Sequence, residues 1–238
     1  MPNILLIPTS FERRLIENAL RMRLGKGLRP NEPNSEWAIE LCGFGLIAAA
    51  ALTAEAIAKL QPARVLLMGI AGSLNDSVTV GTAVAFDRVT CHGIGVGECL
   101  DRRHQSAASL GWPQCETTTG GDAIGDSLPL SMTGVFTDPT SPHQHHHLIS
   151  VPCASADSEE AVRRSDLFVD AAAEDMEGFG AAVACARANI PITIIRGISN
   201  RAGERNHSQW QIEGSLNAAV ELAIPLIQGT PARVQKEM

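Results

Sequence analysis

The chain of 238 residues contains no tyrosine, and aromatic residues make up only 4% of it. Few side chains are therefore available to stack on unpaired bases, as proteins that bind single-stranded nucleic acid require. An excess of positive charge is also missing, because 26 acidic residues outnumber 19 basic ones and give a net charge of -7. Such a chain repels nucleic acid and anionic membranes, so we expect neither as a partner.

The sequence also lacks CxxC pairs and long uncharged apolar runs. Its six cysteines are scattered, which is typical of reduced thiols and predicts a cytoplasmic protein. The first residues, MPNILLIPTSFERR, have neither the basic start nor the long apolar stretch of a signal peptide. No stretch is long and apolar enough to predict a membrane-spanning helix.

Apolar runs and helical patterns alternate along the chain, and hydrophobic residues, 45% of the total, suffice for a sizeable core. Strands are predicted at 3–8, 36–43, 64–72, 82–95, 147–155, 167–172 and 191–199. Helices are predicted at 10–25, 46–60, 158–165, 177–189 and 212–227, with a short one near 127–131. The alternation predicts one α/β domain over residues 1–238, with a mixed, mostly parallel sheet and helices on both faces.

Residues 97–146 interrupt this pattern, since they are rich in Gly, Pro, Ser, Thr and His and show little periodicity. We predict loops there, and the role of residues 91–146 stays open. The histidines at the end of this region suggest either a solvated loop or metal ligands; they are His143, His145, His146 and His147. No carboxylate or cysteine stands at a recognised ligand spacing, so we favour the loop and predict neither a metal nor a cofactor.

Polar residues and glycines follow several of the predicted strands, at 8–12, 69–73, 153–157 and 199–200. Ligands of open α/β sheets bind beyond the carboxyl ends of strands, so we expect the functional site among these segments. The glycines of GIAGSL, residues 69–74, serve either a turn or a close approach of the backbone to a ligand. They have neither a dinucleotide-binding nor a Walker spacing.

Glu12 follows the first strand and permits two interpretations. Thr9 and Glu12 have the spacing of a capping box at the start of a helix. A carboxylate at the end of a strand can also act as a general base that activates water. The spacing alone favours the cap.

Asp175 and Glu177 flank Met176 just before a helix that is rich in small residues. Either carboxylate stabilises the positive end of that helix. A carboxylate at this place can also accept hydrogen bonds from two vicinal hydroxyls, as in a ribose. The residue pattern leaves both interpretations open.

Together, Glu12, GIAGSLNDSVTVGTAVAFDRV, EDMEG and IIRGISN resemble the nucleoside phosphorylase/nucleosidase superfamily over most of the chain outside residues 91–146. Within it, Asn200 and the following RAGERNHSQWQI resemble the futalosine hydrolase family of menaquinone biosynthesis. The resemblance implies a three-layer αβα fold and hydrolysis of a purine N-glycosidic bond. It also implies a homo-oligomer, at least a dimer, in which a neighbouring subunit completes the pocket around the 5′ group.

The resemblance further implies roles for single residues. Glu12 corresponds to the glutamate that activates water, and Asn200 to the residue that reads the purine. Glu177 corresponds to the glutamate that binds the ribose, with Met176 packed under the sugar. Trp210 corresponds to the aromatic residue that closes the 5′ side.

Other positions complete the expected binding site or depart from the family pattern. We expect further substrate contacts from Ile70, Gly72, Ser155 and Ser199. Adenine-specific relatives carry Asp in place of Asn200 and a small hydroxyl residue in place of Ile70. The role of Asp175 stays open, and Arg196 is expected to be a structural charge partner.

Three alternatives accompany the futalosine hydrolase interpretation. The first is a methylthioadenosine/adenosylhomocysteine nucleosidase, and the second is a purine nucleoside phosphorylase, which needs a cationic pocket for phosphate. PTSFERR places the carboxylate of Glu12 where phosphate-using relatives have an anion-binding loop, so we favour water as the nucleophile. The third is a non-catalytic protein that binds nucleosides.

Overall fold

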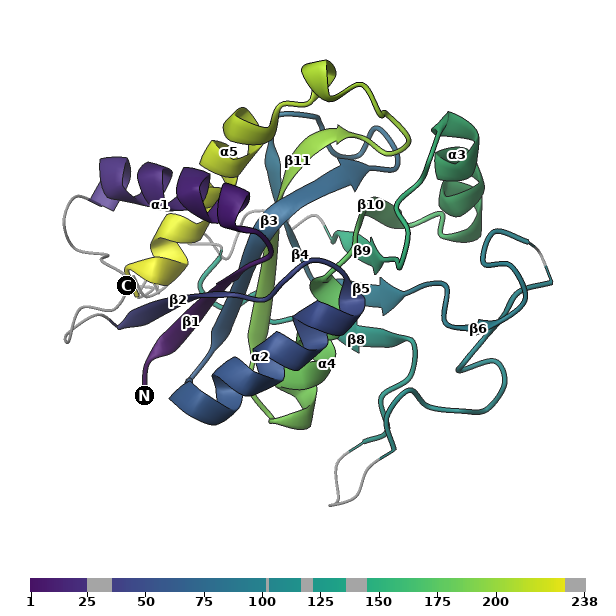
Figure 1. Cartoon of the computed structure of the whole chain (residues 1–238), viewed down its shortest axis with the longest axis horizontal. Helices are drawn as coiled ribbons and strands as arrows, with labels where there is room; N and C mark the ends of the chain where they lie inside the picture. The colour runs from purple at the N-terminus through teal and green to yellow at the C-terminus, as the bar shows by residue number, and fades with distance from the viewer. Residues whose placement is uncertain (25–35, 102, 117–121, 136–144, 230–238) are drawn as a thin grey trace, which may run out of the picture.

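A computed structural model describes residues 1–24, 36–101, 103–116, 122–135 and 145–229 (Figure 1). The strands in these ranges are β1 (Asn3–Ile7), β2 (Trp37–Leu41), β3 (Val65–Ser73), β4 (Ala83–Phe86), β5 (Arg88–Cys91), β6 (Gly95–Val96), β7 (Gln105–Ser106), β8 (Ser127–Pro129), β9 (His147–Ser150), β10 (Ala171–Asp175) and β11 (Ile192–Arg201). The helices are α1 (Ser10–Leu24), α2 (Leu46–Leu60), α3 (Ser158–Leu167), α4 (Gly178–Arg187), α5 (Ile212–Ile227) and the short 3₁₀ turn η2 (His207–Gln209).

Nine of these strands form one mixed sheet. One group, β1, β2, β3 and β11, runs parallel, and a second group, β5, β9 and β10, also runs parallel within itself. The two groups meet where the end of β3 pairs antiparallel with β10, so that Ser73 lies opposite Ala173 and Gly72 opposite Glu174. The predicted mixed, mostly parallel sheet is confirmed.

Helices cover both faces of this sheet, α1 and α5 on one side and α2 and α4 on the other (Figure 1). Ile4 and Leu6 pack in the core cluster that contains α2 and α4, whereas Leu5 and Ile7 pack in the cluster with α1 and α5. Successive side chains of a strand point to opposite faces, so a strand covered on both faces is apolar throughout. The three-layer αβα arrangement is thereby confirmed.

Four predicted elements differ from the structure. Residues 82–95 contain two main strands rather than one, because β4 pairs with β11 while β5 pairs with β8 and β9. The short helix expected near 127–131 is strand β8, which pairs antiparallel with β5. The strand expected at 167–172 begins only at Ala171, since α3 extends to Leu167, and the strand expected at 147–155 ends at Ser150. For β4, β5 and β8 the pairing partner, which local sequence does not reveal, decides the conformation.

In the described part of residues 97–146, regular structure is limited to β7, β8 and an isolated bridge between Cys115 and Ile124. This agrees with the predicted loops. All six cysteines are free. Within the described ranges, none of the helices has the length and apolar character to cross a membrane.

Candidate active site

A cavity of about 250 Å³ lies at the junction of the two strand groups, lined by the last residues of β3, β10 and β11 and by the residues that follow β1. Its walls include most of the site residues expected from the sequence: Glu12, Ile70, Gly72, Met176, Glu177, Ser199, Asn200 and Trp210. The fold thus brings side chains together that lie far apart in the chain. Ser155 is the expected site residue that does not line the cavity.

Glu12 has contacts that fit in part the helix-cap interpretation and in part the interpretation as a carboxylate of the site. The Thr9 hydroxyl accepts a hydrogen bond from the Glu12 N–H at 3.2 Å, as a cap does. In a full capping box the glutamate carboxylate would return to the backbone N–H of the capping residue. Here it accepts from the Thr9 hydroxyl at 2.5 Å and from the Ile70 N–H at 3.1 Å. Thr9 therefore caps the helix, while the buried carboxylate of Glu12 belongs to the cavity.

Arg196 is fully buried next to the cavity and pairs with two carboxylates. Its Nε and Nη2 donate to Oδ2 of Asp175 at 2.9 and 2.5 Å, and Nη2 also donates to Oε2 of Glu177 at 3.3 Å. A cation without water needs such partners, because desolvation otherwise costs several kcal/mol. Arg196 thus has the charge-partner role expected from the sequence.

Gly69 provides the space for this guanidinium. A Cβ atom at Gly69 would lie 2.2 Å from Nη1 of Arg196 and 2.9 Å from Oε1 of Glu12. A side chain at this position would therefore collide with both groups. The same contacts show that Arg196 and Glu12 are neighbours, so three carboxylates surround one guanidinium.

Glu177 has a raised pKa, chiefly because its carboxyl group is buried. Burial raises the pKa of Glu177 from 4.5 to about 7; Arg196 lowers it and Asp175 raises it. Its carboxylate also accepts from the Gly45 N–H at 3.0 Å, which ties the segment before α2 to the cavity. Near neutral pH Glu177 is protonated in part, and a carboxyl group in that state donates as well as accepts hydrogen bonds.

Asp175, whose role the sequence left open, is occupied by protein partners. Besides Arg196, its carboxylate accepts from the Ser150 hydroxyl at 2.5 Å and from the Gly178 N–H at 3.0 Å. These bonds fix Asp175 at the start of α4 and hold Arg196 in one orientation. Both carboxylates around Met176 line the cavity, but Asp175 is bonded to three protein groups and Glu177 retains more capacity for a ligand.

Asn200 lies at the end of β11 and is 6% exposed. Its Oδ1 accepts from the Ser199 hydroxyl at 2.7 Å, and its Nδ2 donates to the Arg201 carbonyl at 2.7 Å. A primary amide has two N–H groups and two lone pairs, so one donor and one acceptor remain for a ligand. Ser199 thereby orients Asn200.

Ser155, for which a substrate contact is expected, does not line the cavity and is bonded to protein groups. It is buried, and its backbone N–H and hydroxyl both donate to the Glu174 carboxylate at 2.9 Å. Arg164 donates to the same hydroxyl at 2.8 Å and forms a buried ion pair with Glu174. No local sequence pattern indicates this pair, because Arg164 comes from α3 and Glu174 from β10.

Sequence reasoning missed several residues of the cavity wall, among them Phe11, Phe44, Glu174 and Arg205. Phe11 lies inside PTSFE and Arg205 inside RAGERNHSQWQI, two segments that the sequence had already marked. Proximity to these motifs was the available signal for both. Phe44 had no such signal, since it follows β2, a strand without a predicted site residue.

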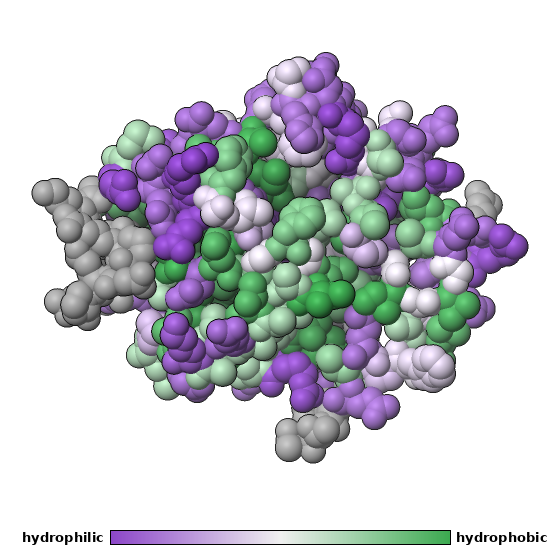
Figure 2. Space-filling view, in the orientation of Figure 1, coloured by the Kyte–Doolittle hydropathy of each residue, from purple (hydrophilic) through white to green (hydrophobic). Residues whose placement is uncertain are grey.

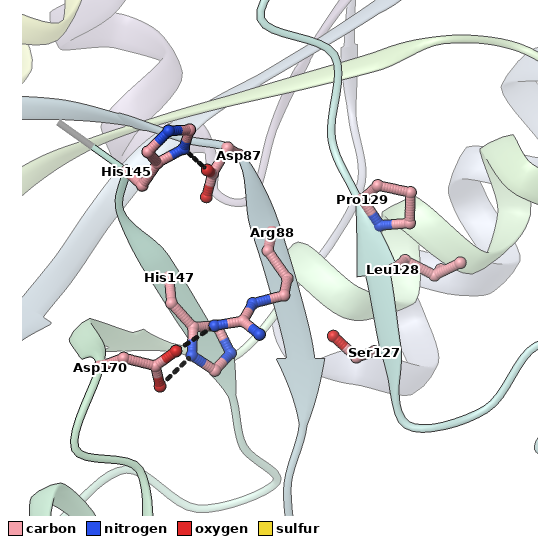
Figure 3. Close-up of a pocket in the computed structure, with 8 residues that line it drawn as sticks. All are labelled: Asp87, Arg88, Ser127, Leu128, Pro129, His145, His147 and Asp170. Carbon is pink, nitrogen blue, oxygen red and sulfur yellow. Dashed lines mark hydrogen bonds and ion pairs between the residues drawn. The ribbon is translucent and has the colours of Figure 1, made fainter. Parts of the chain in front are cut away.

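A second cavity, of about 440 Å³, lies beside the starts of β5 and β9 (Figure 3). Arg88 and His147 both bind Asp170 there, His147 through Nδ1 at 3.1 Å. Nε2 of His147 is 2.7 Å from the Thr90 hydroxyl, and burial lowers the pKa of His147. Both ring nitrogens of His147 are therefore engaged, by Asp170 and by Thr90, at the start of β9.

The solvated loop expected for the histidine run is wrong for His147, which is buried in β9. His146 is half-buried, and His145 is exposed and contacts Asp87. His143 lies outside the described residues. Among the residues that the structure describes, no three His, Cys, Asp or Glu side chains are placed to hold a metal ion.

Comparisons with known proteins agree with this architecture. The sequence profile of the phosphorylase superfamily matches residues 132–229. A futalosine hydrolase from Acidothermus cellulolyticus is 48% identical over 46 residues, which is 19% of this chain and 19% of that relative's length.

Two solved structures match nearly the whole chain. One is the 5′-methylthioadenosine/S-adenosylhomocysteine nucleosidase of Colwellia psychrerythraea in complex with adenine, with a TM-score of 0.72, 19% identity, and coverage of 99% of this chain and 98% of that one. The other is the futalosine hydrolase of Helicobacter pylori, with a TM-score of 0.71, 17% identity, and coverage of 96% and 98%. Identities this low show a common fold. Residues 132–229 therefore match the phosphorylase superfamily in sequence, and the chain as a whole has the fold of these nucleosidases.

Proposed function

We propose that this protein hydrolyses the N-glycosidic bond of a 5′-modified 6-oxopurine nucleoside. Futalosine, cleaved to hypoxanthine and dehypoxanthine futalosine in menaquinone biosynthesis, is the proposed substrate. The observation that carries the proposal is the placement of Glu12, Glu177 and Asn200 around one cavity. The partial match to a futalosine hydrolase supports the choice of substrate.

Each of these groups suits one need of the reaction. In the transition state positive charge develops on the sugar, and electrons pass to the leaving purine. Glu177 binds the ribose hydroxyls and, when ionised, stabilises the positive sugar. Glu12 removes a proton from the water that attacks C1′. Asn200 pairs with the purine through its remaining donor and acceptor, with Met176 beneath the sugar and Trp210 at the 5′ side.

Water suits this cavity better than phosphate as the nucleophile. Phosphate requires free cations or unpaired backbone N–H groups. The groups beside Glu12 are already occupied, since the Ile70 N–H binds the Glu12 carboxylate and Arg196 is neutralised by Asp175 and Glu177. A phosphate dianion beside Glu12 would meet a like charge at short range, which opposes its binding.

Turnover should therefore be independent of phosphate. Futalosine, inosine, methylthioadenosine and adenosylhomocysteine would be incubated with the protein in buffers with and without phosphate, and the released base and sugar identified by chromatography. We expect hypoxanthine and an unphosphorylated sugar from futalosine in both buffers. A sugar 1-phosphate would identify a phosphorylase. Release of adenine alone would identify a methylthioadenosine/adenosylhomocysteine nucleosidase, and binding without release a non-catalytic protein.

Asn200→Asp should change the choice of base. A 6-oxopurine presents an acceptor at O6, which the amide N–H satisfies, whereas an ionised Asp would place acceptor against acceptor. One such mismatch in a buried site costs about 1–3 kcal/mol, roughly ten- to hundredfold in discrimination. The measurement is the kcat/KM ratio for a 6-oxo and a 6-amino nucleoside with the same 5′ group. We expect the ratio to move toward the 6-amino substrate.

Ser199→Ala is the matched control for Asn200, because it removes the hydroxyl that orients the amide without adding charge. It should lower kcat/KM for both bases by similar factors. A ratio that stays unchanged in Asn200→Asp would show that Asn200 does not read the base.

We also propose that the protein is a homo-oligomer, at least a dimer, and that a neighbouring copy borders the cavity. Apolar side chains gather on the face that carries α2, including Ile47, which is 88% exposed (Figure 2). Phe44 is 67% exposed and Phe11 48% exposed, and both line the cavity. Contiguous exposed apolar surface of this kind marks protein interfaces. The molar mass in solution, from light scattering, tests this proposal.

A further inference from the structure

Arg205 is a cation on the wall of a cavity that is otherwise acidic. The carboxylates on the same wall are Glu12, Glu174, Asp175 and Glu177. Most of these charges are balanced by buried arginines behind the wall, since Arg164 pairs with Glu174 and Arg196 with Asp175 and Glu177. Arg205 is the residue with a positive charge that itself lines the cavity in the described part of the chain.

The contacts of Arg205 leave its charge uncompensated. Among the described residues, its guanidinium donates to the carbonyl oxygen of Ser155 and lies over the ring of Trp210, with Cζ 6.0 Å from the ring centroid. Neither contact carries a negative charge. A guanidinium has five N–H donors, so most of them remain for a ligand.

The segment that carries Arg205 is held firmly against the rest of the site. A Cβ atom at Gly203 would lie 2.2 Å from the carbonyl oxygen of Asp157, so this backbone packs directly on the segment before α3. Trp210 Nε1 donates to the Glu204 carbonyl at 3.1 Å, which closes the loop on itself. The buried Arg164–Glu174 pair fixes Ser155, and Ser155 in turn positions Arg205.

We propose that Arg205 is a specificity-determining residue that binds an anionic group, such as a carboxylate, at the distal end of the 5′ substituent. This inference rests on the proposed function, in which Asn200 holds the purine and Glu177 the ribose. The 5′ substituent is the part of the substrate then left to meet Arg205. Arg205 is exposed whereas Asn200 is buried, which places the guanidinium at the outer part of the cavity.

Electrostatics explains why this one residue would discriminate between substrates. An anionic substituent is repelled by the carboxylates of the wall unless a cation receives it. Arg205 supplies two parallel N–H groups that match a carboxylate, and Trp210 supplies an apolar surface beside it. A neutral substituent gains nothing from the guanidinium.

The test compares two 5′-arylthio derivatives of inosine, one with a carboxyl and one with a carboxamide group on the ring. kcat/KM is measured for wild type, Arg205→Gln and Arg205→Lys, and the binding of both compounds by calorimetry. Arg201→Gln is the matched control, because Arg201 pairs with Asp76 on the surface and does not line the cavity.

We expect Arg205→Gln to lower kcat/KM for the carboxylated compound about 10- to 100-fold, through KM. The neutral compound should change less than about twofold, and Arg205→Lys should retain part of the preference.

Equal losses for the two compounds, or none, would overturn the assignment. A loss that instead follows the base, measured with 6-oxo and 6-amino derivatives of the same tail, would also overturn it, because Arg205 would then read the purine. If wild type releases no base from either compound, the proposed hydrolase function fails. The binding ratio of the carboxylated and neutral compounds then decides the role of Arg205 separately.

Discussion

Glu12→Gln should lower kcat by about 10²- to 10⁴-fold, the usual contribution of a positioned general base. Glutamine keeps the shape of the side chain and can still accept from the Ile70 N–H, but it cannot take a proton from water. KM should change little, because the ribose and the base are bound by other residues. Steady-state kinetics with the substrate identified above gives both constants.

Because Glu12 lies in the first turn of α1, next to the capping residue Thr9, the stability of this variant must be measured as a control. The Thr9 hydroxyl, and not the Glu12 carboxylate, accepts the hydrogen bond from the helix N–H. The free energy of unfolding of Glu12→Gln should therefore lie within about 1 kcal/mol of the wild-type value. Glu17→Gln is the matched change on the same helix, where Glu17 pairs with Arg13, and it should keep full activity. An unstable but fully active Glu12→Gln would reduce Glu12 to a helix cap.

Arg196→Met should destabilise the protein by about 3–5 kcal/mol, since removal of one partner leaves buried charges uncompensated. Methionine fills much of the same volume, so the loss of charge dominates the effect. Asp175 and Glu177 would then lie next to each other without a cation between them. Urea unfolding, with the free energy extrapolated to water, measures the change.

The loss in Arg196→Met should depend on pH in a defined direction. Without the guanidinium, which lowers the pKa of Glu177, the folded-state pKa of Glu177 rises further above the unfolded value, so the folded state binds more protons. Its free energy of unfolding then falls as pH rises. In wild type the same effect already acts on Glu177 between its ordinary pKa of 4.5 and its folded pKa of about 7. The deficit of the variant should be smaller at pH 5 than at pH 8.

Arg201→Met serves as the control for Arg196→Met. Arg201 also lies on β11, but its ion pair with Asp76 is exposed, with side chains 68% and 86% accessible. Exposed pairs contribute about 0–1 kcal/mol, so this change should be nearly neutral at both pH values. Similar losses in the two variants would mean that the buried charge cluster does not hold the site together.

The layers of the fold were predictable because they depend on patterns that are local in the sequence. A run such as NILLI, buried on both faces, has no polar side and indicates a central strand without further information. β8 was not predictable in this way. SLP is a strand only because β5 offers a free edge to it, and a segment of three residues has no pattern of its own.

The site was predictable where a family motif carries a residue and unpredictable where long-range contacts decide its role. Glu12 had the sequence of a cap, and only the position of the Ile70 N–H shows that its carboxylate turns to the cavity. Ser155 lies in the expected segment 153–157, but its hydroxyl is bonded to Glu174 and Arg164, an ion pair formed between two other elements. Arg205 lies within RAGERNHSQWQI, but only the fold shows that it lines a cavity together with several carboxylates.

The antiparallel junction between β3 and β10 has a consequence for the order of folding. β3 also pairs with β11, more than a hundred residues along the chain, with Ile192 opposite Val65. Pairing across such separations is slow, because the loop must close before the contact stabilises it. The cavity draws on both strand groups, so neither group alone would contain a complete set of reacting side chains. The proposed reaction therefore requires the pairing of both strand groups, and activity recovered during refolding would time the completion of the native topology.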